Sequence, residues 1–150
     1  MEKIRGFEKV KRLGSQEIKL PERSTEYSAG YDFFAIEDVD IKYNQIMVIR
    51  TGVKAYMLED EGLFLYNRSS NPRKKNLILM NGVGVIDADY YNNEENEGEI
   101  GFMFMNTNPD MTVSIKAGDK LGQGVFQKIL LADGDVAGGK RKGGFGSTGK

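Results

Sequence analysis

The amino-acid sequence predicts an all-β fold built from short strands. Between Val10 and Leu131, short apolar segments of strand length alternate with turn residues, and no stretch keeps a helical period for three turns. Many short strands favour a sandwich, a jelly roll or a barrel, because these architectures cover or close the edges of their sheets. The 150 residues are enough for one domain with its own core.

The predicted strands follow from the apolar pattern. Residues 111–115 alternate as expected of a strand with one buried face, whereas residues 63–66 are apolar on both faces and predict a strand between two layers or two subunits. The strands predicted in chain order are residues 39–41, 46–49, 53–57, 63–66, 77–79, 83–86, 100–105, 111–115 and 125–130.

The composition excludes several chemistries. Cys and His are both absent, which removes disulfides, thiolate metal sites, a Cys nucleophile and any Ser-His arrangement, so a general base must be Asp, Glu, Lys or Tyr. The 21 basic residues against 22 acidic ones give no general attraction to nucleic acid, and we expect no direct nucleic-acid binding. No apolar run approaches the ~20 residues of a membrane span and the N-terminus lacks a secretory signal, so we expect no membrane association and a cytoplasmic location.

Residues 84–90 (Gly-Val-Ile-Asp-Ala-Asp-Tyr) place two carboxylates and a phenol directly after a predicted buried strand. Charged side chains so close to the core need water, a partner or a ligand to offset desolvation, which favours the mouth of a pocket. Two nearby glycines leave room for a ligand to lie against the backbone. We interpret Asp87, Asp89 and Tyr90 as a candidate chemical centre. The alternative is a plain β-turn, because Asp often hydrogen-bonds turn backbone.

A cation and two hydroxyls follow another predicted buried strand, at Arg68, Ser69 and Ser70. Asn71, followed by Pro, predicts an N-cap and a short helical turn through Lys75. Arg68, Ser69 and the free amides of the helix start would converge on one anion-sized volume. A capped loop without a ligand is the alternative.

Three further stretches carry weaker signals. Asp32 stands before aromatic residues, which is typical of a turn that opens a core strand. Residues 118–126 predict a turn that enters a strand, with Gln123 placed to reach a ligand. Residues 91–99 are polar, acidic and rich in turn formers, and they predict a solvated loop between two hairpin strands.

The composition changes after Leu131, and residues 138–150 contain six Gly and a single aromatic residue, Phe145. Such a segment cannot bury enough surface to order itself, so we predict a domain at residues 1–137 and a flexible segment at residues 138–150. Its Gly, Ser and Thr are typical of phosphate-binding backbone, although no strand and helix flank it as in a Walker P-loop. A disordered tail and an aromatic lid are equal alternatives.

Together and in this order, five stretches resemble the motifs of the trimeric deoxyuridine triphosphatases (dUTPases). They are residues 29–33 (Ala-Gly-Tyr-Asp-Phe), 68–70 (Arg-Ser-Ser), 84–90, 118–123 (Gly-Asp-Lys-Leu-Gly-Gln) and 143–149 (Gly-Gly-Phe-Gly-Ser-Thr-Gly). Each motif alone is weak, but the resemblance covers the whole chain. It implies a jelly-roll or distorted β-barrel subunit of a homotrimer, with active sites shared between chains.

The resemblance also implies the reaction: dUTP and water give dUMP and pyrophosphate by water attack on the α-phosphorus, with Mg²⁺ on the triphosphate. Such an enzyme limits uracil in DNA and supplies dUMP for dTMP synthesis. Asp87 would orient and deprotonate the water, and Asp32 would bind waters of the Mg²⁺ shell. Asp89 is expected to hold the shape of the turn.

The remaining roles that the resemblance implies concern substrate binding. Tyr90 would pack under the deoxyribose and exclude a ribose 2′-OH. The uracil would be bound by Asn81, by the backbone at Gly84 and Ile86, and by stacking of Phe145. The phosphates would be held by Arg68, Ser69, Ser70, Gln123, Arg141, Ser147 and Thr148.

This sequence departs from the family pattern at two places. The link at residues 91–98 is longer than the family's usual link, and Lys140 stands where the family commonly has Arg, with Arg141 one residue closer to Phe145. Two alternative functions remain: a deoxycytidine triphosphate deaminase of the same fold, or a nucleotide-gated signalling protein that binds a regulatory protein partner at residues 91–98.

Overall fold

The structure, a computed structural model, describes residues 2–145 and confirms the predicted all-β fold. Its strands are β1 (Gly6–Lys9), β2 (Tyr31–Phe34), β3 (Val39–Ile41), β4 (Ile46–Arg50), β5 (Val53–Tyr56), β6 (Glu61–Asn67), β7 (Leu77–Leu79), β8 (Gly84–Asp87), β9 (Gly101–Asn106), β10 (Val113–Ile115) and β11 (Lys120–Lys128). The helical elements are single turns, η1 (Lys11–Leu13), η2 (Asn71–Lys75) and η3 (Ala88–Tyr90). Among the described residues, no helix has the length and apolar character needed to cross a membrane.

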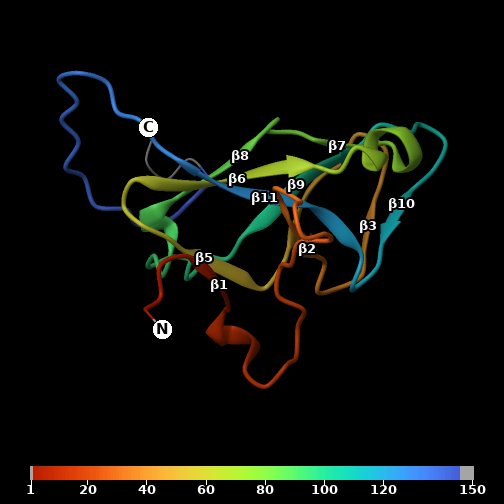
Figure 1. Cartoon of the computed structure of the whole chain (residues 1–150). Helices are drawn as coiled ribbons and strands as arrows, with labels where there is room; N and C mark the ends of the chain where they lie inside the picture. The colour runs from red at the N-terminus through yellow and green to blue at the C-terminus, as the bar shows by residue number, and fades with distance from the viewer. Residues whose placement is uncertain (1, 146–150) are drawn as a thin grey trace.

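The strands form antiparallel sheets in which neighbours along the chain belong to different sheets. One sheet has the order β2-β11-β6-β8 and another the order β4-β9-β7, while β1 pairs with β5 and β3 pairs with β10. In Figure 1, β6 crosses the view between β8 and β11. After β11, the chain returns to the side of the molecule where β8 ends and η3 follows it. Alternation of consecutive strands between sheets is typical of jelly rolls.

The core lies between the two larger sheets. Phe33 and Leu63, from the first sheet, are fully buried against Ile49 and Phe102 from the second. The rings of Phe33 and Phe102 have their centroids 5.5 Å apart, which joins the sheets directly. Gly122 makes this packing feasible, because a Cβ there would lie 2.5 Å from the carbonyl oxygen of Tyr66.

Most predicted strands agree with the structure within one or two residues, but three elements differ. Asp32, expected in a turn that opens a core strand, lies within β2 itself. β11 begins at Lys120, five residues before the predicted start at residue 125, and pairs with β2 and β6 from there. β1 was not among the predicted strands, and it is held by pairing with β5, where Phe7 lies opposite Ala55.

The short turn η2 corrects the prediction for Asn71. The turn does end at Lys75, but its N-cap residue is Ser70, which makes no capping hydrogen bond with its side chain. Asn71 is buried instead, and its Nδ2 donates to Asn67 Oδ1 at 2.7 Å and to the Leu121 carbonyl at 2.9 Å. Asn71 therefore ties the end of β6 to β11.

Residues 91–98 do not connect two hairpin strands as predicted. The strands on either side, β8 and β9, belong to different sheets, so the loop crosses between layers. Asn93 is 8% exposed, and Glu97 forms an ion pair with Lys54, whose side chain is 4% exposed. Burial raises the pKa of Glu97, but hydrogen bonds from Lys54 and the Lys11 amide outweigh it and keep that pKa below its usual value. The loop is therefore packed and ion-paired rather than simply solvated.

Candidate active site

A cavity of about 250 Å³ lies at the end of β8, beside residues 84–90. Tyr90 is 5% exposed and contributes its ring to the wall, whereas Asp87 is exposed at the mouth. Gly84, which is buried, and Ile86 complete the strand side. The full lining is Leu65, Asn81, Gly84, Val85, Ile86, Asp87, Tyr90, Gly101, Arg141, Gly144 and Phe145.

The C-terminal segment of the same chain covers this cavity. Arg141 is only 11% exposed at its side chain, and its guanidinium donates to Asp89 at 2.7 Å and to Asp87. Gly144 lies against the Tyr90 ring, where a Cβ would be 2.4 Å from the nearest ring carbon. Asp89, predicted to hold the turn, instead contributes to this ion pair.

Lys140 and Arg141 differ sharply in their surroundings. Lys140 lies 3.8 Å from Glu94 and is 86% exposed at its side chain, whereas Arg141 reaches both carboxylates of the candidate centre. Arg141 is therefore the cation that the described part of the tail brings to the cavity.

The ring of Tyr90 is held at both ends. Its hydroxyl donates to the Glu99 carbonyl at 2.6 Å and accepts from Asn96 Nδ2 at 2.8 Å. Its backbone carbonyl accepts from Asn93 Nδ2 at 2.7 Å. Burial raises the pKa of the Tyr90 hydroxyl above its usual value, with the Asn96 hydrogen bond acting in the opposite direction. Tyr90 therefore stays neutral and presents a fixed apolar face to the cavity.

A second group of candidate residues lies where β2, β6 and β11 meet. Gln123 of β11 pairs with Asp32 of β2 on one side and with Tyr66 of β6 on the other. Arg68 and Ser69 follow the end of β6 directly, and Arg68 is half-buried while Ser69 is exposed. The carboxylate of Asp32 is 3.4 Å from Lys120 Nζ. Lys120 and the strand neighbour Gln123 thus lie beside the Asp32 carboxylate.

The two groups lie at opposite ends of β6. Asp87 is paired with Gly62 near the start of the strand, whereas Arg68 follows its last residue, Asn67. At about 3.3 Å per residue, the backbones of the two groups are about 20 Å apart. One chain therefore brings Asp87, Tyr90 and Arg141 together, but it does not bring Arg68 and Gln123 to them.

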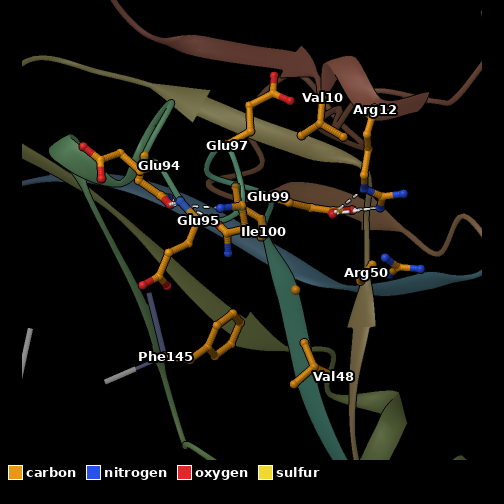
Figure 2. Close-up of a pocket in the computed structure, with 13 residues that line it drawn as sticks. Val10, Arg12, Val48, Arg50, Glu94, Glu95, Glu97, Glu99, Ile100 and Phe145 are labelled. Carbon is orange, nitrogen blue, oxygen red and sulfur yellow. Dashed lines mark hydrogen bonds and ion pairs between the residues drawn. The ribbon is translucent and has the colours of Figure 1, made fainter. Parts of the chain in front are cut away.

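Phe145 lines both this cavity and a larger hollow of about 600 Å³, which is drawn in Figure 2. Its ring is near Val48 and Gly101, while Glu99 extends towards Arg12 on the far side of the hollow. Phe145 is 60% exposed. Ser147 and Thr148, predicted to meet a phosphate, lie outside the described residues.

Sequence reasoning missed Asn93 and Asn96, the residues that hold Tyr90. The segment was interpreted as solvated because acidic residues dominate it, yet Asn93 is buried and Asn96 partly so. The feature of the sequence that could have indicated these buried residues is the repetition of Asn within a turn-rich stretch, since Asn side chains commonly hydrogen-bond nearby backbone. Asn93 Oδ1 does accept from the amides of Glu95 and Asn96.

Comparisons with known proteins agree in pointing to one family. A family model described as dUTPase matches residues 16–149. The deoxyuridine 5′-triphosphate nucleotidohydrolase of Lactococcus lactis is 54% identical over 149 residues, covering 98% of this chain and 99% of the relative. That of Corynebacterium glutamicum is 34% identical, covering 95% and 94%. The crystal structure of dUTPase from Streptococcus mutans has a TM-score of 0.82 at 49% identity, covering 86% of this chain and 99% of that one.

A jelly-roll β fold that gathers a carboxylate, a buried phenol and an arginine around one cavity, and these relatives, define a nucleotide hydrolase. The comparisons leave the alternative of a deaminase without support. The chain belongs to the dUTPase family, and it is a hydrolase that acts on dUTP.

Proposed function

We propose that the chain converts dUTP to dUMP and pyrophosphate by attack of water on the α-phosphorus, with Asp87 as the base. The carrying observation is that Asp87 stands at the mouth of the Tyr90 cavity, where a carboxylate can hold a water against a ligand bound inside. With neither His nor Cys in the chain, a carboxylate is the best base available. The reaction would limit dUTP for DNA synthesis in the cytoplasm and supply dUMP for dTMP synthesis.

The nucleoside fits the cavity beside β8. Asn81 and the backbone at Gly84 and Ile86 offer polar groups to the edge of uracil, and the rigid Tyr90 ring supplies the surface under the deoxyribose. An extra 2′-OH would press on a ring that two hydrogen bonds hold in place. Phe145, near the same cavity, would stack on the base.

The phosphates fit the group at the other end of β6. Arg68, Ser69, Ser70 and Gln123 are proposed to bind phosphate oxygens, because a guanidinium fork, hydroxyls and an amide match such acceptors. Mg²⁺ usually takes one or two carboxylates and completes its shell with water and phosphate, so Asp32 alone suits an ion held through water. Residues 2–145 contain no group of three potential metal ligands. When bound, Mg²⁺ would neutralise charge on the triphosphate.

The separation of the two groups is the argument for shared sites in a homotrimer. A substrate phosphate must be near Asp87 and Arg68 at once, yet about 20 Å of β6 separates them in one chain. The outer face of β4 and β9 also exposes apolar side chains: Ile46 (50% exposed) and Val48 (40%) lie opposite Met105 and Met103. Such a face marks a contact with other protein surface, and we propose further copies of this chain.

The tail is proposed to close over bound nucleotide. Arg141 already occupies the cavity mouth by pairing with Asp87 and Asp89, and a triphosphate offers it a stronger anion. Ser147 and Thr148 would add donors to the γ-phosphate. The contacts of residues 91–98 with Tyr90 and Lys54 account for the buried part of that loop, and we propose no regulatory partner for it.

One assay tests this function as a whole. Pyrophosphate release is measured with dUTP, dTTP, dCTP and UTP, with Mg²⁺ and with excess chelator. We expect turnover of dUTP at least about 100-fold above the others. A polar site that reads the uracil edge rejects the mismatched edge of dCTP strongly. UTP brings its 2′-OH against the fixed Tyr90 ring, and dTTP adds a methyl group to the base. We expect chelation to remove most of the activity. Similar turnover of all four nucleotides, or full activity in chelator, would contradict the proposal.

The lid is tested by the same assay on a chain that ends at Gly139. This chain keeps the described β sheets and loses Arg141 and Phe145. We expect a lower kcat/KM for dUTP with an unchanged thermal unfolding midpoint. Unchanged kinetics would show that the tail has no part in the site.

A further inference from the structure

Asn96 stands in the long loop at residues 91–98, outside every motif that the family resemblance singled out. Its amide nevertheless reaches the hydroxyl of Tyr90, with Nδ2 to Oη at 2.8 Å. The Tyr90 hydroxyl has only one proton, and the Glu99 carbonyl accepts it at 2.6 Å. The second hydrogen bond to Tyr90 must therefore come from a donor, and Asn96 is that donor.

The orientation of the Asn96 amide is fixed by its other partners. The amide N–H of Gly98 donates to Asn96 Oδ1 at 3.0 Å, and Asn93 Nδ2 donates to the same oxygen at 2.8 Å. Backbone N–H groups only donate, so the oxygen must face Gly98 and the nitrogen must face Tyr90. A flipped amide would set two donors against each other and two acceptors against each other.

The loop that carries Asn96 is itself fastened to the body of the protein. Glu97 pairs with the buried Lys54 and accepts from the Lys11 amide, and Lys54 also donates to Asn92. Directly after the loop, Glu99 forms a bidentate contact with Arg12, visible as dashed lines in Figure 2. Because the loop is anchored, Asn96 is held in place and in turn restricts the position of the Tyr90 ring.

We propose that Asn96 is a positioning residue for sugar discrimination: by holding the Tyr90 hydroxyl, it fixes the ring so that a ribose 2′-OH cannot be accommodated. The inference rests on the proposed role of Tyr90 under the deoxyribose. It assigns a function in specificity to the longer loop.

Loss of the Asn96 donor lets the Tyr90 ring move towards the position of the Asn96 side chain. This movement affects turnover of the disfavoured substrate, UTP. The kcat/KM for UTP is expected to rise, because its 2′-OH meets a ring that can move. The kcat/KM for dUTP changes little, because dUTP already fits. A net hydrogen bond of ordinary strength sets the scale, so the ratio of kcat/KM for dUTP to that for UTP is expected to fall about three- to tenfold. Damage to the fold alone would lower dUTP turnover without raising that of UTP.

The test compares Asn96→Asp and Asn96→Ala with the unaltered chain, using pyrophosphate release from dUTP and UTP. Asn96→Asp keeps the oxygen that accepts from Gly98 and Asn93 but replaces the donor to Tyr90 with an acceptor. Asn96→Ala removes both the donor and that oxygen without adding charge. Asn92→Gly is the matched control, because it breaks a contact with Lys54 in the same loop, suits the positive φ of 58° at that position and leaves Tyr90 untouched.

We expect both Asn96 variants, but not Asn92→Gly, to lower the ratio through a higher kcat/KM for UTP. In a Tyr90→Phe background, which has no hydroxyl to hold, Asn96→Ala should have no further effect. An unchanged ratio in both Asn96 variants, or an undiminished effect in the Tyr90→Phe background, would overturn the inference. Tyr90→Ala separates the two proposals: if it also leaves the ratio unchanged, the role of Tyr90 fails as well.

Discussion

Replacement of Asp87 by Asn is expected to lower kcat for dUTP by about 10²–10⁴-fold, the range that a positioned general base contributes. Asn keeps the shape of the side chain and still orients a water, but it cannot accept the proton. The KM for dUTP is expected to change little, because Asp87 lies at the mouth of the cavity rather than within the nucleoside pocket. Steady-state pyrophosphate release measures both constants.

Asp89→Asn is the matched control for this prediction. Asp89 is two residues away, is exposed and binds the same Arg141, but it does not line the 250 Å³ cavity. We expect its kcat to stay within about threefold of the native value, the scale of an exposed ion pair. Equal losses in the two variants would mean that the carboxylates act through Arg141 rather than through water.

Replacement of Arg68 by Ala is expected to lower kcat/KM for dUTP by about 10²–10³-fold, the usual cost of removing one preorganised donor to developing charge. Arg68→Lys should recover only part of this loss, because an ammonium lacks the planar fork that binds two phosphate oxygens. Both variants are measured by dUTP turnover, with thermal unfolding to confirm the fold.

Arg73→Ala controls for the loss of positive charge in the same segment. Arg73 is exposed on η2, five residues further along, and does not line the cavity that the proposed function uses. We expect its kcat/KM to be nearly native. A loss in Arg73→Ala as large as in Arg68→Ala would replace specific phosphate binding with a general effect of charge.

The fold was predictable where one face of a strand is apolar, and it was missed where pairing alone makes the strand. β3, β4 and β7 carry their own apolar pattern and were found. β1 has one large apolar residue, Phe7, so only its pairing with β5 defines it. The start of β11 was interpreted as a turn because of its glycines, yet Gly122 is needed where the strand passes close to Tyr66 and Phe102.

The site was predictable as far as residue types identify chemistry. Asp87 and Tyr90 were expected beside a pocket and both line one. The pairing of Arg141 with Asp87 and the contact of Asn96 with Tyr90 join positions far apart in the chain or hidden in an acidic loop, and neither has a local pattern. Asn71 shows the reverse case: a correct local cue for a helical turn gave it the wrong role, because tertiary contacts with Asn67 and Leu121 took its side chain.

We propose that one active site takes Asp87 from one chain and Arg68 from another, since β6 keeps them apart within a chain. The direct measurement mixes Asp87→Asn and Arg68→Ala chains, unfolds and refolds them together, and records dUTP turnover. Random assembly of a trimer would leave about a quarter of the sites with both native residues. We therefore predict that the mixture regains about a quarter of the activity of refolded native protein. Mixed assemblies as inactive as their two parents would contradict the account.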